Sequence, residues 1–163
     1  MIQLIPYSDS FADELTGFVI SFWKVHHSDV SPDQARETLR DWTKDDRRLF
    51  IIQKDELTVG FLCIHNSSPE VCWIDDIFVD APYRGQGIAG EAIGMMERAQ
   101  RSTGTRSFCM EVVPDNLPAM RLYHRLGYDR LSLITLRKDD DPFTDARTET
   151  IAGFPLRVKQ FDD

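Results

Sequence analysis

The segment Arg84-Gly85-Gln86-Gly87-Ile88-Ala89 constrains the fold most, because it places two glycines between an apolar segment and an amphipathic one. Residues 71–79 have the apolar character of a strand, and residues 87–102 have the spacing of a helix. Glycine permits a tight turn and lets a ligand approach the main chain. The free N–H groups and the positive dipole end of the helix then face the turn. The segment therefore predicts a strand–loop–helix unit that can bind an anion such as a pyrophosphate.

The periodicity of apolar residues predicts further strands and helices on both sides of this unit. We expect Ser10 to cap the first helix and Ser31-Pro32 to open the second. The predicted strands are 3–5, 49–53, 59–64, 71–79, 107–113, 131–137 and one within 151–158, and the predicted helices are one after Ser10, 32–44, 87–102 and 116–126. This order predicts an α/β (α+β) fold, with a mixed central sheet of about six to seven strands and helices on both faces.

The length of 163 residues predicts one domain, 1–163, in which 139–163 form a C-terminal extension able to add a strand. Hydrophobic residues make up 42% and charged residues 28%, which is globular composition and excludes a disordered or membrane-spanning chain. The first residues lack the basic and long apolar regions of a signal peptide. We therefore expect a cytoplasmic protein.

The charge and the cysteines restrict the partners and the chemistry. A net charge of −8 argues against nucleic acid and against anionic membranes as partners. The three cysteines lie far apart in apolar segments, which predicts buried free thiols in a reducing compartment. The four histidines show no metal-ligand spacing, so we expect no metal site.

The glycines also fit a second pattern, the G-x-G-x-x-G fingerprint of dinucleotide-binding folds. Gly85, Gly87 and Gly90 match it, and Glu111 follows in the next predicted strand. However, residues 80–84 separate the strand from the first glycine, and the motif lies in the middle of the chain rather than in a first βαβ unit. A dinucleotide oxidoreductase is therefore the weaker interpretation.

Two segments together resemble a known family. Residues 79–89 resemble the acyl-CoA pyrophosphate loop of the GNAT superfamily of N-acetyltransferases. Residues 113–128 resemble that family's downstream motif, with Asn116 at the start of a short helix, a Leu122-Tyr123 pair and a Gly127-Tyr128 step. The two motifs occur in the family's order. The resemblance implies a GNAT fold and acetyl-CoA as the co-substrate.

The resemblance also implies which residues hold acetyl-CoA. The glycine turn would bind the pyrophosphate, the main chain before it would pair with pantetheine and polarise the thioester carbonyl, and Asn116 would bond the pantetheine arm. The implied cofactor-binding residues are Ile77, Phe78, Val79, Arg84, Gly85, Gln86, Gly87, Ile88, Ala89, Asn116 and Tyr123.

For catalysis, the resemblance implies that an amine attacks the thioester directly and that Tyr123 protonates the leaving thiolate. Asp75, the first acid of the Asp75-Asp76 pair, would bind and deprotonate the amine, through a water because aspartate is short. Adjacent strand residues point to opposite faces, so we expect one of the two acids in a given cleft. Glu111 on the neighbouring strand is a rival base, and another group remains an alternative.

The acceptor is the least defined part of this interpretation. In the family the first two helices build the acceptor wall, so Phe22, Trp23 and His26 are candidate substrate contacts, with aromatic core packing as the alternative. The acidic pair is similar to that of the polyamine and small-amine branch, which implies a small cationic amine. A peptide or protein amine and a non-catalytic acyl-CoA-binding module are the alternatives. Family habit also implies a homodimer.

Overall fold

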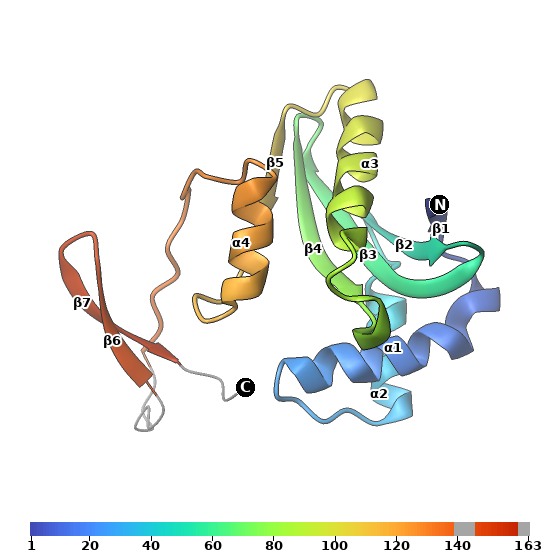
Figure 1. Ribbon diagram of the computed structural model, residues 1–163, viewed down its shortest axis with the longest axis horizontal. Coiled ribbons are helices and arrows are strands. Elements are labelled where there is room, and N and C mark those ends of the chain that lie inside the picture. The colour runs from blue at the N-terminus through green and yellow to red at the C-terminus, as the bar shows by residue number, and fades with distance from the viewer. Residues whose placement is uncertain (139–145, 160–163) are drawn as a thin grey trace. The chain divides into compact units, whose positions relative to one another are not determined.

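The structure is a computed structural model that describes residues 1–138 and 146–159 (Figure 1). The chain divides into two compact units, Met1–Glu111 and Val112–Asp163, each of which is described by itself. Residues 139–145 and 160–163, which belong to the predicted C-terminal extension, lie outside the described residues.

The first unit is built on a five-stranded sheet in the order β1-β2-β3-β4-β5. The first four strands pair antiparallel, and β5 pairs parallel with β4. The elements of this unit are β1 (Ile2–Pro6), a 3-10 turn (Asp9–Phe11), α1 (Ala12–Val25), α2 (Pro32–Asp41), β2 (Arg47–Lys54), β3 (Leu57–Ser68), β4 (Val71–Val79), a 3-10 turn (Ala81–Tyr83), α3 (Ile88–Ser102) and β5 (Ser107–Met110).

Helices α1 and α2 cover one face of this sheet. Leu15 and Val19 of α1 are fully buried against the strands, and Phe22 packs edge-on against Phe61 of β3 and Trp42 after α2. Full burial of one such apolar side chain stabilises the fold by about 1.5–3 kcal/mol. This aromatic layer fixes the position of α1 and α2 over β2, β3 and β4.

Helix α3 covers the other face, through Ile88, Ala92, Ile93 and Met96. The sulfur of Met96 lies 4.0 Å from Cys72 Sγ, on the side of β4 opposite to the aromatic layer. In Figure 1, α3 runs alongside β4, whereas α1 lies across the lower end of the sheet. The mixed sheet with helices on both faces confirms the predicted fold class.

The predicted helix starts have different outcomes. Ser31 caps α2, and a reciprocal bond with Gln34 completes a capping box, so that prediction is confirmed. The prediction that Ser10 caps α1 is wrong, because Ser10 lies inside the 3-10 turn and its hydroxyl contacts Ser8 Oγ at 2.8 Å. Helix α1 instead begins after Phe11 without a side-chain cap.

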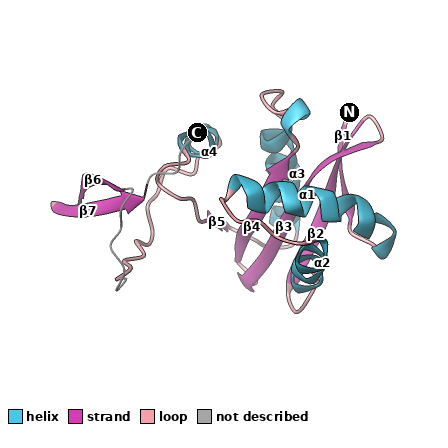
Figure 2. Ribbon diagram, turned by 90° about the horizontal axis from the view of Figure 1, so that it is seen from below, coloured by secondary structure: helices cyan, strands magenta, loops and turns pink. Residues whose placement is uncertain are grey.

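The second unit contains α4 (Leu117–Arg125), β6 (Ala146–Ile151) and β7 (Phe154–Lys159). Strands β6 and β7 form an antiparallel two-stranded sheet, drawn in magenta in Figure 2. The strand expected within 151–158 is β7. The strand predicted over 131–137 does not form, because no strand among the described residues pairs with it. The central sheet therefore has five strands rather than six to seven.

Candidate functional site

The glycine turn has the backbone geometry that its sequence predicts. Gly85 and Gly87 adopt φ values of 74° and 79°, which side chains with a Cβ rarely tolerate. Gly87 is the N-cap of α3, and no side chain caps this helix. The leading N–H groups of α3 therefore keep their capacity to bind an anion.

Side chains around the turn fix its shape. Arg84 Nε donates a hydrogen bond to the carbonyl oxygen of Val79 at 2.8 Å, and its guanidinium lies 5.4 Å from the centre of the Phe78 ring. Gln86 accepts a hydrogen bond from Lys54 Nζ at 2.5 Å. Lys54 was missed by sequence reasoning, because no local pattern shows that the end of β2 lies beside this turn.

The edge of β4 that precedes the turn is unpaired on one side. Strand β3 pairs with β4 as far as Val79, whereas β5 pairs with it only from Val71 to Ile74. In the described part of the first unit, no strand therefore covers the second edge of Ile77, Phe78 and Val79. Main-chain groups on that edge can pair with an extended ligand, as they would with another strand.

A β-bulge in β4 brings both adjacent acids to one face. Cys63 pairs with Asp76 and Ile64 pairs with Ile74, so Asp75 is an extra residue in β4. Asp76 lies opposite Cys63, which belongs to the core under α1 and α2, and Asp75 contacts His65 on the same face. The expectation that adjacent acids point to opposite faces is therefore wrong, because the bulge interrupts the alternation of the strand.

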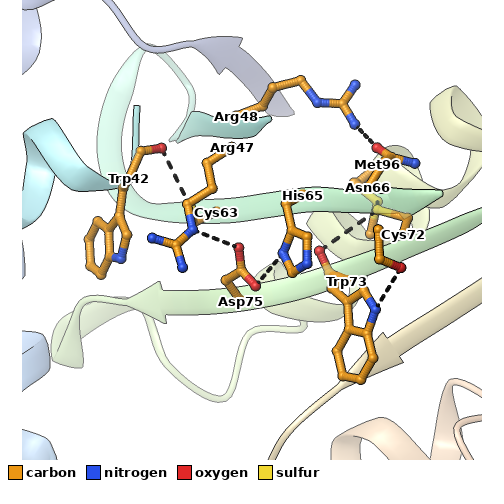
Figure 3. Close-up of polar contacts among 11 residues, drawn as sticks. Trp42, Arg47, Arg48, Cys63, His65, Asn66, Cys72, Trp73, Asp75 and Met96 are labelled. Carbon is orange, nitrogen blue, oxygen red and sulfur yellow. Dashed lines mark hydrogen bonds and ion pairs between the residues drawn. The ribbon is translucent and has the colours of Figure 1, made fainter. Parts of the chain in front are cut away.

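Asp75 lies between a histidine and an arginine (Figure 3). Its Oδ1 atom is 2.7 Å from His65 Nδ1, and its Oδ2 atom is 3.5 Å from Arg47 Nε. The His65 ring stacks on Trp73, with 6.2 Å between ring centres and an interplanar angle of 6°. These four side chains, from β2, β3 and β4, form a polar cluster that we call the Asp75 cluster.

Asp76 is a second titratable group beside this cluster. Burial, followed by the negative charge of Asp75, raises the pKa of Asp76 to about 6, while Arg47 and a hydrogen bond from Trp42 act in the opposite direction. A carboxyl group with such a pKa exchanges protons near neutral pH.

Glu111 follows Met110, the residue of β5 that pairs with Ile74, and makes no ion pair with these acids. It is exposed and has no hydrogen bond or ion pair with another described residue. In the second unit, Asn116 Oδ1 accepts a hydrogen bond from Ala119 N at 3.2 Å, so Asn116 caps α4 as expected. The half-buried Tyr123 packs edge-on against Tyr128, with 6.3 Å between ring centres.

The three candidate substrate contacts lie at the end of α1. Phe22 is buried in the core, which agrees with the alternative of aromatic packing. Trp23 packs edge-on against Phe22, and its buried Nε1 has no hydrogen-bond partner among the described residues. The His26 ring lies 4.5 Å from that of Phe22, and desolvation, followed by the charge of His27, lowers the pKa of His26.

The cysteines behave as structural thiols. Cys63 and Cys72 are buried and Cys109 is half-buried. Burial raises the pKa of both buried thiols, that of Cys72 to about 11, which suppresses the reactive thiolate. Across residues 1–138 and 146–159, no group of His, Cys, Asp and Glu has the arrangement of a metal site. The same residues include no helix long and apolar enough to cross a bilayer.

Sequence reasoning missed His65 and Arg47 as members of the site. His65 was interpreted as an isolated histidine, because its neighbours come from other strands. The pairing of His65 with Trp73, and the bulge that turns Asp75 toward it, depend on the β3–β4 register. An alternating pattern in β3 alone does not reveal that register.

Comparisons with known proteins agree with the geometry. Residues 13–128 match the sequence model of the acetyltransferase (GNAT) family. A mycothiol acetyltransferase of Corynebacterium glutamicum (strain R) is 33% identical over 94 residues, which are 58% of this chain and 32% of that protein. An aminoglycoside N(6')-acetyltransferase type 1 of Salmonella typhimurium is 25% identical over 126 residues, 72% of this chain and 84% of that protein.

A solved structure has a similar fold. The aminoglycoside N-acetyltransferase AAC(6')-Iy, in complex with CoA, superposes with a TM-score of 0.69 at 17% identity and covers 86% of this chain and 96% of its own. The chain spans about a third of the length of the mycothiol acetyltransferases that it matches, as the 32% coverage shows.

Proposed function

Because the chain belongs to the acetyltransferase (GNAT) family, we propose that it transfers an acetyl group from acetyl-CoA to a primary amine by direct attack. One observation carries this proposal: the unpaired edge of β4 is followed, after a 3-10 turn, by the uncapped start of α3 with its two glycines. An extended pantetheine arm and a pyrophosphate need these two features in this order.

In this proposal the first unit binds the pantetheine arm of acetyl-CoA at its thioester end and at its pyrophosphate end. Main-chain groups of Ile77, Phe78 and Val79 pair with pantetheine and polarise the thioester carbonyl. The pyrophosphate binds the N–H groups from Gln86 to Ala89, and Arg84 adds a positive charge that its bond to Val79 holds in place. Lys54, which bonds Gln86, strengthens the local positive field.

We assign the chemistry of transfer to two groups. The Asp75 cluster takes the proton from the attacking amine, and Tyr123 gives a proton to the leaving thiolate. The cluster is better suited than Glu111, because Asp75 is hydrogen-bonded to His65 and ion-paired with Arg47, whereas Glu111 is exposed and has no partner among the residues described. Asn116, while it caps α4, bonds the pantetheine arm.

We propose a small cationic amine as the acceptor. The bulge puts two carboxyl groups, Asp75 and Asp76, on the face that α1 and α2 cover, which favours an ammonium group there. The relatives support the same class, since one of them is named an aminoglycoside acetyltransferase. Trp23 and His26 would form part of the acceptor wall.

Thermal unfolding with and without saturating acetyl-CoA, with NADH as the control, tests the cofactor. A ligand at 100 times its Kd adds about 2.7 kcal/mol of stability. We expect a rise in Tm with acetyl-CoA alone. A rise with NADH alone would instead support a dinucleotide site. A thiol-release assay over polyamines, aminoglycosides, amino acids and peptides then identifies the acceptor class, and the absence of turnover with all of them would favour a binding module.

A further inference from the structure

We propose that His65, positioned by Asp75, accepts a proton from the acceptor's ammonium group, which then attacks as the neutral amine. This inference rests on the proposed function and names the residue within the Asp75 cluster that performs the step. The cluster contains a carboxylate, an imidazole and an indole in contact, which is the arrangement that orients a histidine base.

The hydrogen bond between Asp75 and His65 defines the state of the imidazole. A carboxylate Oδ1 at 2.7 Å from Nδ1 accepts a proton held on Nδ1. The lone pair of neutral His65 is then on Nε2, the atom that a base needs. Nε2 has no hydrogen-bond partner in the part of the chain that the structure describes, and the side chain is 31% exposed. It is therefore both free and accessible.

The ring of His65 is held in orientation by its neighbours. Trp73 stacks on one face of the ring, and Trp73 is itself fixed by a hydrogen bond from Nε1 to Ser67 Oγ at 3.1 Å. Asp75 fixes the edge that carries Nδ1 (Figure 3). A base held on a face and an edge needs little reorganisation when it takes a proton.

Asp75 is less suited to take the proton itself. One of its oxygens bonds His65, and the other faces Arg47 at 3.5 Å, while the side chain is only 16% exposed. Oδ1 is thus engaged by His65, whereas the buried Oδ2 has an ion pair with Arg47 but no hydrogen-bond partner among the described residues. The imidazole also extends further than an aspartate, which removes the need for a relaying water. Asp75 is therefore a positioning residue, and His65 is the proton acceptor.

The charges around His65 fit this role. The strand register places Arg47 of β2 opposite His65, and Asp75 contacts it directly, while Cys63 and Asp76 form the next pair along the same face. Around His65, two carboxyl groups outnumber the single arginine. The imidazolium that forms also has the Asp75 carboxylate as its direct hydrogen-bond partner. That carboxylate stabilises the positive charge during the reaction.

The step balances without another reactant. The ammonium gives one proton to His65 Nε2, and the neutral amine nitrogen forms a bond to the thioester carbonyl carbon. The carbon–sulfur bond then breaks, and the thiolate takes a proton from Tyr123. The amide nitrogen then loses its second proton, which restores the Tyr123 hydroxyl through solvent, and His65 returns its own proton to solvent.

The test compares two acceptors in His65→Gln, with His124→Gln on the exposed face of α4 as the matched control. One acceptor is spermidine or kanamycin, whichever wild type acetylates faster, whose amines are ammonium ions at neutral pH. The other is hydroxylamine, which is already neutral there. We expect His65→Gln to lower kcat/KM about 100-fold for the ammonium acceptor and far less for hydroxylamine, after subtraction of the uncatalysed rate. His124→Gln should match wild type with both.

An equal loss with both acceptors, or no loss, would overturn the assignment to His65. Asp75→Asn is the second variant: it should lower the rate with the ammonium acceptor while the Tm rise with acetyl-CoA persists. Nitrogen NMR of wild type adds a readout independent of turnover, because neutral His65 should carry its proton on Nδ1, and a proton on Nε2 contradicts the proposal. A wild type that binds acetyl-CoA but acetylates neither acceptor would overturn the proposed function itself.

Discussion

Gly60 of β3 faces the main chain of Phe78 so closely that an added Cβ would lie 2.0 Å from the carbonyl oxygen of Phe78. The atoms that the Cβ would meet are backbone atoms of β4, and displacing them costs free energy. We expect Gly60→Ala to lower the free energy of unfolding by about 1–3 kcal/mol. It should also weaken acetyl-CoA binding, because it displaces the end of β4 that the proposed pantetheine site uses. Chemical unfolding and the Tm rise with acetyl-CoA measure the two effects.

Gly17 of α1 provides the matched control for that substitution. It is exposed, and an added Cβ there would meet no atom within 4 Å. Alanine favours a helix interior by roughly 0.5–1 kcal/mol over glycine. Gly17→Ala should therefore stabilise the protein and leave acetyl-CoA binding unchanged. A similar loss of stability in both variants would contradict the close approach at Gly60.

Asp76 should make stability depend on pH. Its pKa of about 6 in the folded protein exceeds the ordinary value of 3.8. The stability that protonated Asp76 contributes is therefore fully present below pH 3.8 and is lost as the pH rises through 6. The full loss corresponds to about 2–3 kcal/mol at most. Asp76→Asn should therefore be more stable than wild type at pH 7, and this gain should vanish near pH 4. Urea unfolding at both values measures it.

Asp46→Asn is the control for the pH experiment, since Asp46 is exposed and has no ion pair with another described residue. The difference in the free energy of unfolding between Asp46→Asn and wild type should be the same at pH 4 and pH 7. If Asp76→Asn showed the same flat profile, the pKa of Asp76 would not be raised by its surroundings.

Gly87 should be required by both the backbone and the ligand. Alanine at its φ of 79° costs about 1–2 kcal/mol, and a shifted turn would misdirect the N–H groups of α3. We expect Gly87→Ala to raise the Kd for acetyl-CoA about tenfold, or 1.4 kcal/mol. Gly104, with a φ of 106° after the end of α3, is the control. Gly104→Ala should destabilise the protein without changing that Kd, as calorimetric titration can show.

Tyr123 should affect turnover rather than binding. Tyr123→Phe keeps the ring contact with Tyr128 and removes the proposed acid. We expect kcat to fall about 100-fold with little change in the KM for acetyl-CoA. Tyr128→Phe also keeps this ring contact, removes the other hydroxyl, and should leave kcat unchanged. Equal effects of the two variants in the thiol-release assay would rule out a specific role for the Tyr123 hydroxyl.

Local sequence signals predicted the parts of the fold that depend on neighbouring residues. The glycine turn, the start of α2 at Ser31-Pro32 and the start of α4 at Asn116 each follow from residues within a few positions, and all three form as predicted. The apolar alternation of residues 131–137 also indicated a strand, but alternation does not supply a pairing partner. No described strand pairs with that segment, and its apolar side chains are exposed.

The candidate site was predicted less completely, for a physical reason. Asp75 was identified from its neighbours in sequence, whereas its actual partners, His65 and Arg47, come from two other strands. Which residues meet across a sheet depends on register, and a single extra residue changes it. The bulge has no signature in the sequence of β4, so neither the shared face of the two acids nor the role of His65 could be predicted.

The bulge at Asp75 has a consequence for engineering the protein. Because Asp75 is the residue in excess, removing it from the chain would leave Ile74 opposite Ile64 and Asp76 opposite Cys63, with regular pairing from Gly60 to Asn66. Shortening β4 by one residue would thus halve the number of carboxylates at this position without moving either end of the strand. A one-codon deletion would therefore remove one carboxyl group and the β-bulge together, whereas a replacement at Asp75 changes the charge and leaves the bulge in place.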